Sequence, residues 1–375
     1  MVSEILKNPN LFIKIQKELD KTIVGEGKVK RALFLGMNMI NVQNQKSKKK
    51  IIIGGESSSG KDFVMKAIGE IFPTNRNIYQ TRISNKLLNY WHANEPGWTW
   101  DNKNLCLTDV NDELLNSDVF KVFLTDGSDA TIVINGKAVN LKVNGRPNVF
   151  VTTAEGNPNN QMLTRFDLIT LDESADQTEK IMEYQAREAE TGEAEVYDKK
   201  IISALSQLKR VKVIVPYAMK MIKYFPKSTK MRRVYPSFID YIRSSCALHQ
   251  YQRKKDSKNN FIAEEQDYMI AREIIENIRE QTLTGKTSSE TKYLSIFESL
   301  INKGPEKHLS YTEIHKKSGY KTPETWWRIM KSLEEKGIVV GDELDEPGAF
   351  KPVRKYKLKQ ANKEDLLKLP IYKEL

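Results

Sequence analysis

The sequence is poor in the residues that build covalent or metal-held scaffolds. It contains two cysteines, Cys106 and Cys246, and four histidines among 375 residues. Two cysteines cannot make a disulfide framework or a four-cysteine zinc site, and only four histidines are available to complete a mixed one. We therefore expect a reducing, cytoplasmic setting.

Long apolar runs are also missing. No stretch approaches the roughly 18 apolar residues that a membrane-spanning helix needs. The N-terminal residues, Met1 to Asn10, lack the apolar core of a signal peptide. The sequence therefore predicts a protein without a membrane partner.

Acidic side chains are outnumbered by basic ones. Sixty Lys and Arg against 49 Asp and Glu give a net charge of +11 and a pI of about 9.2. Basic proteins are drawn to polyanions, because the phosphates release bound counterions when Lys and Arg replace them. A polyanion is thus the natural partner. With 375 residues the chain exceeds one ordinary core, so we expect two or three domains.

The sequence does contain a phosphate-binding loop. Three β-branched residues, Ile51 to Ile53, predict a buried parallel strand, and the spacing from Gly55 to Lys61 is G-x-x-x-x-G-K. Such a loop turns backbone N–H groups toward phosphates, and the helix predicted from Phe63 to Phe72 directs its positive end at them. We expect Mg²⁺ and ATP to bind here. The predicted nucleotide-binding residues of the loop are Gly55, Glu56, Ser57, Ser58, Ser59, Gly60, Lys61 and Asp62.

The metal site departs from the usual pattern. Asp62 replaces the Ser or Thr whose hydroxyl ordinarily binds Mg²⁺, and a second buried strand, Asn104 to Asp109, ends in the acid of a Walker B motif. If Asp109 is the metal-binding acid, Val110 stands in the catalytic position. If Asp109 is catalytic, Thr108 replaces the metal-binding acid. We favour the second alignment, in which Asp62 and Thr108 exchange roles as carboxylate and hydroxyl ligands. Further candidates follow the strand: Asn111, Asp112 and Glu113.

Two more elements follow from pattern alone. Alternating β-branched residues on both sides of Asn135-Gly136 predict a hairpin over 131–143, with Lys137 at its tip. This hairpin is either a DNA contact or an ordinary cap on a sheet edge. The aromatic stretch from Tyr90 to Trp100 is expected to pack against the sheet rather than to stack on bases.

The C-terminal part is predicted to be helical from Val211 onward, with a linker from Leu283 to Ser289. Beyond the linker, a helix, a helix-turn-helix and a hairpin predict a winged helix, whose second paired helix usually enters the major groove of DNA. Docking to a protein is the alternative use of this fold. The side chains expected to contact DNA are Lys321, Arg328 and Lys331 on that helix and Arg354 and Lys355 on the wing.

Taken together, residues 20 to 280 resemble the AAA+ helicases, most closely the minichromosome-maintenance (MCM) type and its short relatives on viruses, plasmids and other mobile elements. The most specific match is Thr164 to Ile169, which resembles the arginine-finger segment of the family. The resemblance implies that Arg165 reaches the γ-phosphate of a neighbouring subunit in a ring, usually a hexamer. It also implies a sensor 1 role for Thr153, a sensor 2 role for Arg233, and contacts to adenine by Ile23 and Val24.

The predicted fold is α/β: a AAA+ P-loop core with a parallel sheet at 1–200, an α-helical lid at 201–285 and a winged-helix domain at 286–375. The predicted function is an ATP-dependent DNA helicase that acts on single-stranded or forked DNA in the replication of a virus or mobile element. In this mechanism Asp109 orients the attacking water, and Lys61, Mg²⁺ and Arg165 neutralise charge on the phosphates. Two alternatives are a superfamily 3 viral helicase and a AAA+ initiator or regulator that hydrolyses ATP slowly.

Overall fold

The structure, a computed structural model, describes residues 3–55, 58–153, 165–229, 231–284, 288–301, 308–310, 313, 323–335, 338–344, 353–358 and 369–375. The chain divides into two compact units. Unit 1 comprises Met1–Thr282 and Leu367–Leu375, and unit 2 comprises Leu283–Leu366. No helix in the described part of the chain has the length and apolar character needed to cross a membrane.

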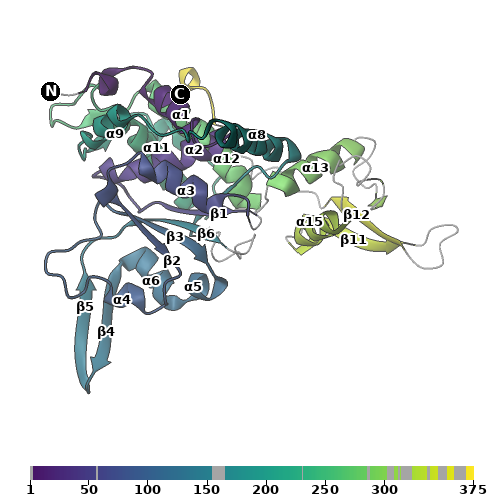
Figure 1. Cartoon of the computed structure of the whole chain (residues 1–375), viewed down its shortest axis with the longest axis horizontal. Coiled ribbons are helices and arrows are strands. Elements are labelled where there is room, and N and C mark those ends of the chain that lie inside the picture. Colours follow the sequence, from purple (N-terminus) through teal and green to yellow (C-terminus); the bar gives the residue numbers. More distant parts are fainter. Residues whose placement is uncertain are drawn as a thin grey trace. The chain divides into compact units, whose positions relative to one another are not determined.

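A five-stranded parallel sheet forms the centre of unit 1 (Figure 1). Its strands, in spatial order, are β2 (Asn77–Thr81), β3 (Asn104–Val110), β6 (Asn148–Thr153), β1 (Lys50–Gly54) and β7 (Asp167–Thr170). All pairs are parallel, so the strands end together along one edge, which we call the carboxyl edge, and begin along the other, the amino edge.

Helices cover both faces of the sheet, which explains why its central strands are continuously apolar. Ile51 and Ile53 point into the larger cluster of buried side chains, whereas Ile52 points into the smaller one on the opposite face. The larger cluster includes residues of α1 (Leu11–Leu19), α2 (Gly27–Asn38), α3 (Lys61–Glu70), α9 (Lys199–Ser206), α11 (Met231–Leu248) and α12 (Glu265–Thr284). The smaller one includes residues of α4 (Leu87–Tyr90), α5 (Asp112–Asn116) and α6 (Asp118–Asp126).

The predicted hairpin is confirmed as β4 (Ser128–Ile134) and β5 (Lys137–Val143), which extend away from the sheet (Figure 1). Asn135 and Gly136 have φ angles of 50° and 75°, the left-handed pair that a two-residue turn requires. At the base of the hairpin, Trp100 is fully buried and its Nε1 donates to Ser128. The prediction that the aromatic stretch packs is therefore confirmed for Trp100.

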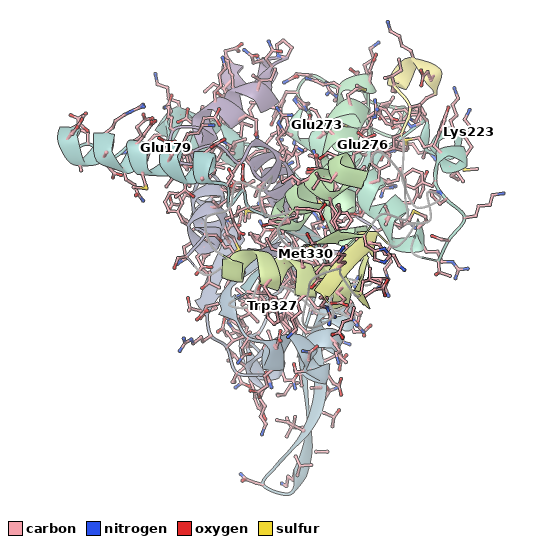
Figure 2. All side chains as sticks on the ribbon, turned by 90° about the vertical axis from the view of Figure 1, so that its right-hand side faces the viewer. Glu179, Lys223, Glu273, Glu276, Trp327 and Met330 are labelled. Carbon is pink, nitrogen blue, oxygen red and sulfur yellow. The ribbon has the colours of Figure 1, made fainter. Side chains whose placement is uncertain are left out.

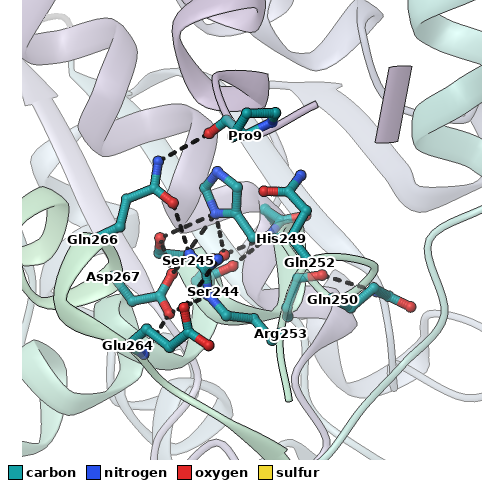
Figure 3. A network of polar contacts seen from close by, with 12 residues as sticks. Pro9, Ser244, Ser245, His249, Gln250, Gln252, Arg253, Glu264, Gln266 and Asp267 are labelled. Carbon is teal, nitrogen blue, oxygen red and sulfur yellow. Dashed lines mark hydrogen bonds and ion pairs between the residues drawn. The ribbon is translucent and has the colours of Figure 1, made fainter. Parts of the chain in front are cut away.

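The helical part of unit 1 follows the sheet and is drawn together by a buried polar network between α11 and α12 (Figure 3). Its remaining elements are α8 (Ala175–Thr191), β8 (Val213–Ile214), α10 (Ala218–Met221) and β9 (Phe261–Ile262). Short 3₁₀ turns are η1 (Glu4–Lys7), η2 (Met39–Asn41), η3 (Thr74–Arg76), η4 (Ile222–Tyr224) and η6 (Tyr372–Glu374).

The C-terminal residues differ from the predicted domain boundary. We placed all of 286–375 in one domain, but 367–375 belong to unit 1. Tyr372 packs edge-on against Tyr217 at 5.2 Å between ring centroids, and Tyr268 donates its hydroxyl proton to the Pro370 carbonyl. These aromatic contacts with the helical part hold the C-terminus there.

The described part of unit 2 combines two long helices with a small antiparallel sheet. Its described elements are α13 (Ser288–Ile301), β10 (Leu309–Ser310), α15 (Pro323–Glu335), β11 (Val339–Leu344) and β12 (Val353–Leu358), with the sheet order β10-β12-β11. Its core packs Tyr293 and Phe297 of α13 against Met330 of α15. This unit therefore has a core of its own.

Candidate nucleotide site

The loop from Gly55 to Lys61 lies at the carboxyl edge, between the end of β1 and the start of α3. Gly60 has a φ of 87° and precedes the first turn of α3, whose N-terminus has no side-chain cap. The first N–H groups of a helix lack partners within the helix and attract anions. Ser58 also has a left-handed φ of 66°, which a serine adopts only under constraint. Glu56 and Ser57 lie outside the described residues.

Lys61 lies across the loop instead of pointing into solvent. Its side chain is buried, and its Nζ donates to the Gly55 carbonyl at 2.9 Å and lies 3.5 Å from Ser59 Oγ. The ammonium group therefore lies against two described residues of the loop, Gly55 and Ser59. This geometry fits the predicted role of Lys61 as the cation for the phosphates.

A carboxylate that the sequence did not reveal stands beside the loop. A Cβ built on Gly55, whose φ is 148°, would lie 2.8 Å from Glu173 Oε1 and 2.9 Å from Ser59 Oγ. Gly55 is therefore required both by its backbone conformation and by this close approach. Glu173 follows β7, which ends at the same edge of the sheet.

Asp62, in the first turn of α3, is half-buried and accepts a short hydrogen bond from the Thr152 hydroxyl of β6. The same Thr152 oxygen accepts the backbone N–H of Asp109 at 3.1 Å. One hydroxyl therefore joins the phosphate loop, β6 and the end of β3. Thr152 was not among the predicted site residues, because a threonine inside an apolar strand carries no pattern of its own.

Asp109 occupies a strained position at the end of β3. The register with β6 shifts between Leu107 and Val110, and Asp109 takes a left-handed φ of 54°. This bulge turns the carboxylate out of the sheet, where its Oδ2 accepts from Arg82 Nε and Nη2, both at 3.2 Å. The carboxylate is 38% exposed, so a ligand at the carboxyl edge can reach it.

The expected sharing of Mg²⁺ by Asp62 and Thr108 is not what these contacts favour. Thr108 is 1% exposed, and its hydroxyl is 2.7 Å from the hydroxyl of Thr81 on the neighbouring strand. Asp62 instead pairs with Thr152. The bulge explains the difference, because it separates the direction of Thr108 from that of Asp109. The carboxylate oxygens at this edge that are of the type a divalent cation binds are thus those of Asp62 and Asp109, with Glu173 beside Gly55.

Comparison with protein families agrees with this geometry. A family model described as the MTBMA_p00010 P-loop domain matches residues 1–209. The chain belongs to this P-loop domain family. No curated protein matches the chain. A P-loop domain binds a nucleotide, usually with Mg²⁺, and the N-terminus of α3 at the end of this loop, together with Lys61, suits that ligand.

Arg165 lies at the opposite edge of the sheet from the P-loop. It precedes β7, whose Asp167 pairs in register with Ile51 near the start of β1. Burial lowers the pKa of the nearby Lys50 to about 8, and the charges of Arg233 and Arg165 add to the effect. The length of β1, about 15 Å, separates this edge from the P-loop.

A buried ion pair fixes this arginine segment. Lys49 Nζ forms a short ion pair with Asp167 and donates to Ser237 Oγ of α11 at 2.8 Å. The same ammonium lies 3.9 Å from the ring centroid of Tyr241. Burial lowers the pKa of Lys49, while the Asp167 carboxylate opposes that shift. The segment that carries Arg165 is thus tied to the helix that carries Arg233.

The turn predicted to contact adenine is held by side chains that the sequence analysis did not identify. Gln177 Nε2 donates to the Val24 carbonyl at 2.8 Å, and the buried Lys30 Nζ donates to the Ile23 carbonyl at 3.1 Å. Gly25 has a φ of 64°, and a Cβ there would clash with Gln177. Because Gln177 is 153 residues from Val24, local patterns could not reveal this contact.

The remaining predicted residues are placed as follows. Thr153 is buried at the end of β6, and Arg233 is exposed on α11. Lys137 is exposed at the hairpin tip. Lys321, like the side chain of Arg328, lies outside the described residues.

In unit 2 the predicted DNA-contacting residues are partly engaged with the chain itself. Lys331 is exposed, with its Nζ 5.1 Å from the Trp327 ring centroid, and Lys355 is half-buried. Arg354 Nη2 donates to both carboxylate oxygens of Glu334, at 2.8 and 3.0 Å. A phosphate at this position would therefore compete with Glu334 for Arg354.

Proposed function

We propose that this P-loop protein is an ATP-dependent DNA helicase or translocase of the AAA+, MCM-like type that acts as a ring in DNA replication of a virus or mobile element. The observation that carries the proposal is the placement of the hairpin. It is inserted between β3 and β6, the two strands that bear Asp109 and Thr152 at the nucleotide edge. The hairpin is connected to the end of β3 through α5 and α6 and leads directly into the start of β6, so a shift of either strand can reach it through these elements.

Different residues of the chain have different roles in the proposed hydrolysis. Lys61 and the N-terminus of α3 would bind and orient the phosphates, and Asp62 and Asp109 would hold the metal. Bound Mg²⁺ neutralises charge on the phosphate oxygens. Asp109 also positions the water for in-line attack once its carboxylate leaves Arg82.

Arg165 acts on a neighbouring subunit in this proposal. It lies about 15 Å of strand away from its own P-loop, so it cannot contact its own γ-phosphate. In a ring it faces the nucleotide of the next subunit, as does Arg233. Unit 2 is proposed to be a winged helix that binds DNA separately, since it has its own core and is joined through a polar linker.

The test is strand displacement on a forked DNA with and without ATP. Lys137→Ala is expected to preserve ATP hydrolysis and to lose most unwinding, whereas Lys142→Ala, lower on the same hairpin and paired with Asp129, should unwind normally. Arg165→Ala should lower turnover by roughly 10³-fold without loss of ATP binding. Mixing Arg165→Ala with Lys61→Ala subunits should restore part of the hydrolysis. Absence of unwinding by the wild-type protein would contradict the proposal.

A second candidate is a AAA+ switch that binds DNA and ATP but hydrolyses slowly. The pairing of Asp109 with Arg82 favours it, because that ion pair occupies the acid needed for hydrolysis. A switch would bind ATP and DNA with little turnover, and Arg82→Ala would then raise hydrolysis. In the helicase, DNA itself should stimulate turnover.

A further inference from the structure

Helix α8 is exposed along almost its whole length. Of its 17 residues only Gln177 is buried, and the helix begins where β7 ends, at the carboxyl edge. Ile181 and Tyr184 are half-buried, on the same side of the helix as Gln177. A helix that is polar around most of its surface needs a partner or many ion pairs for stability.

The side of α8 that faces away from the body has a distinct composition. Met182 is 62% exposed there, and Ala175, Ala186 and Ala189 continue an exposed apolar stripe at helical spacing. Glu179, Glu183 and Glu190 flank this stripe. We call these residues the acidic face.

The acidic face stands out against the charge of the protein. The chain carries a net charge of +11. Between 175 and 195 only Lys180 and Arg187 are basic, and the acids are Asp176, Glu179, Glu183, Glu188, Glu190, Glu193 and Glu195. The sole ion pair recorded within the described helix joins Glu183 to Arg187 at 3.6 Å. The face is therefore suited to a basic partner.

A surface of opposite charge occurs elsewhere in unit 1. On α10 and η4, Met219 is 78% exposed and Ile222 is 48% exposed. Lys220, Lys223 and Lys227 are exposed around them. We call these five residues the basic patch. Like the acidic face, the basic patch has apolar side chains at its centre and charged side chains around them.

The two surfaces lie on opposite sides of unit 1. Figure 2 shows Glu179 of the acidic face on one flank and Lys223 of the basic patch on the other. The bonded contacts agree: the Tyr235 hydroxyl of α11 donates to the Ala218 carbonyl of α10, and Ser237 of the same helix binds Lys49 at the amino edge. The acidic face thus belongs to the carboxyl edge and the basic patch to the amino edge.

We infer that the acidic face of one copy of this chain docks on the basic patch of the next copy. Met182 packs against Met219 and Ile222, and Glu179 and Glu183 pair with Lys220 and Lys223. Two different surfaces on opposite sides make a head-to-tail contact, which closes into a ring when the rotation between copies permits. The inference rests on the proposed ring and supplies its contact surface.

Docking between copies would also affect nucleotide binding. Docking brings the amino edge of one copy, with Arg165, toward the carboxyl edge of the next, with the P-loop. On the inner side of the docked helix, Gln177 holds the Val24 carbonyl, so fixing α8 also fixes the turn of the nucleotide site. Assembly should therefore tighten nucleotide binding.

DNA is the competing partner for the basic patch, but the patch is not built for it. Met219 and Ile222 stand at its centre, and a phosphate backbone offers no apolar partner for them. A second copy offers both an apolar stripe and carboxylates.

The test uses charge reversal in the full-length chain, with self-association measured by sedimentation at several concentrations, in the presence and absence of a non-hydrolysable ATP analogue. Glu179→Lys/Glu183→Lys and, separately, Lys220→Glu/Lys223→Glu should each weaken association by about tenfold or more, since two charge pairs become repulsive. Mixing the two variants, or combining all four changes in one chain, should restore association. Lys199→Glu/Lys200→Glu, an equal charge change on the exposed surface of α9, is the control.

Each outcome decides the inference. Loss in both variants with mutual rescue supports it. Unchanged association, loss without rescue, or a wild-type chain that stays monomeric at every soluble concentration overturns it. If Lys220→Glu/Lys223→Glu weakens only DNA binding, the patch is a DNA surface and the inference is wrong. Because the readout needs neither DNA nor hydrolysis, a ring that forms but does not unwind DNA would refute the proposed function alone.

Discussion

Two polar clusters of unit 1 resemble each other in residue type but differ in how many hydrogen-bonding positions of their carboxylates remain available to a ligand. In the helical part, the Asp267 carboxylate accepts from Arg253 at two positions, from Ser245 and from the Glu264 N–H (Figure 3). At the carboxyl edge, Asp62 and Asp109 have fewer partners and are half-exposed. In the first cluster, which we call the closed cluster, the chain supplies the partners of the buried carboxylate, whereas the second, which we call the open cluster, retains capacity for a ligand.

The comparison shows why residue type alone misleads. Ser245, His249 and Asp267 have the composition of a catalytic triad, yet Ser245 and His249 are fully buried one helical turn apart. His249 Nδ1 is 2.8 Å from the Ser245 backbone carbonyl and 3.5 Å from the Ser245 hydroxyl, so the carbonyl is the nearer partner. A nucleophile that no substrate can reach performs no catalysis. This cluster stabilises the junction of α11 with α12.

The largest expected effect is at the open cluster. Lys61→Ala should abolish nucleotide binding, because the ammonium group that would neutralise the phosphates is lost. Lys66→Ala is the matched control, since Lys66 is exposed on the same helix. Titration with a fluorescent ATP analogue measures both variants. Unchanged affinity of Lys61→Ala for the ATP analogue would contradict the assignment of residues 55–61 as a nucleotide-binding loop.

The closed cluster should respond in stability instead. Asp267→Asn leaves the Arg253 guanidinium buried without its carboxylate, which costs roughly 3–5 kcal/mol of unfolding free energy. Nucleotide affinity, measured well below the melting temperature, should change little. Denaturant titration gives the loss. A variant as stable as wild type would show that the buried pair contributes nothing.

The same residue makes the closed cluster sensitive to acid. Burial raises the pKa of Asp267, but hydrogen bonds and charge from Arg253 and His249 outweigh it and hold the pKa below its ordinary value. A carboxylate with a depressed pKa contributes stability above its unfolded pKa of about 3.9, and this contribution is lost as the pH falls through the folded pKa. Below about pH 4 the stability difference between wild type and Asp267→Asn should therefore shrink.

Local sequence patterns predicted the strands, the loop and the hairpin turn of this part of the chain better than they predicted the side-chain contacts of the open cluster. The strand, the G-x-x-x-x-G-K spacing and the Asn135-Gly136 turn are each short segments whose physical requirements are visible in consecutive residues. The partner of Asp62 was not visible. Thr152 is 90 residues away, and the bulge that redirects Asp109 depends on register with β6. Long-range pairing, rather than propensity, decides these contacts.

The next prediction concerns Thr152, the hydroxyl on which the open cluster depends. Thr152→Val keeps the shape of the side chain but leaves the Asp109 N–H without its acceptor. This costs about 1–3 kcal/mol of unfolding free energy. We expect kcat to fall by about tenfold, the Mg²⁺ concentration needed for half-maximal activity to rise, and the melting temperature to fall by a few degrees. Thr152→Ser should recover most of the loss. Equal behaviour of the Val and Ser variants would mean that the hydroxyl does not position Asp62 and Asp109.

The smallest expected effect lies at the margin of the open cluster, at Glu26. Burial raises the pKa of Glu26 to about 7, and the neighbouring Asp172 and Glu173 act in the same direction against a hydrogen bond from the Asp172 N–H. A raised folded pKa means that the stabilising contribution is complete below the unfolded pKa of about 4.3 and is lost as the pH rises through about 7. Glu26 should therefore destabilise the Val24 turn at pH 8.

Glu26→Gln tests this by removing the titration while keeping the acceptor oxygen for the Asp172 N–H. The variant should match wild type in melting temperature near pH 5 and exceed it by a few degrees at pH 8, because the buried negative charge of Glu26 is removed. Glu70→Gln, an exposed carboxylate on α3, should show no such difference between the two pH values. If wild type and Glu26→Gln keep the same melting difference from pH 5 to pH 8, Glu26 does not titrate in this range. The open cluster would then extend no farther than the loop, Thr152 and Asp109.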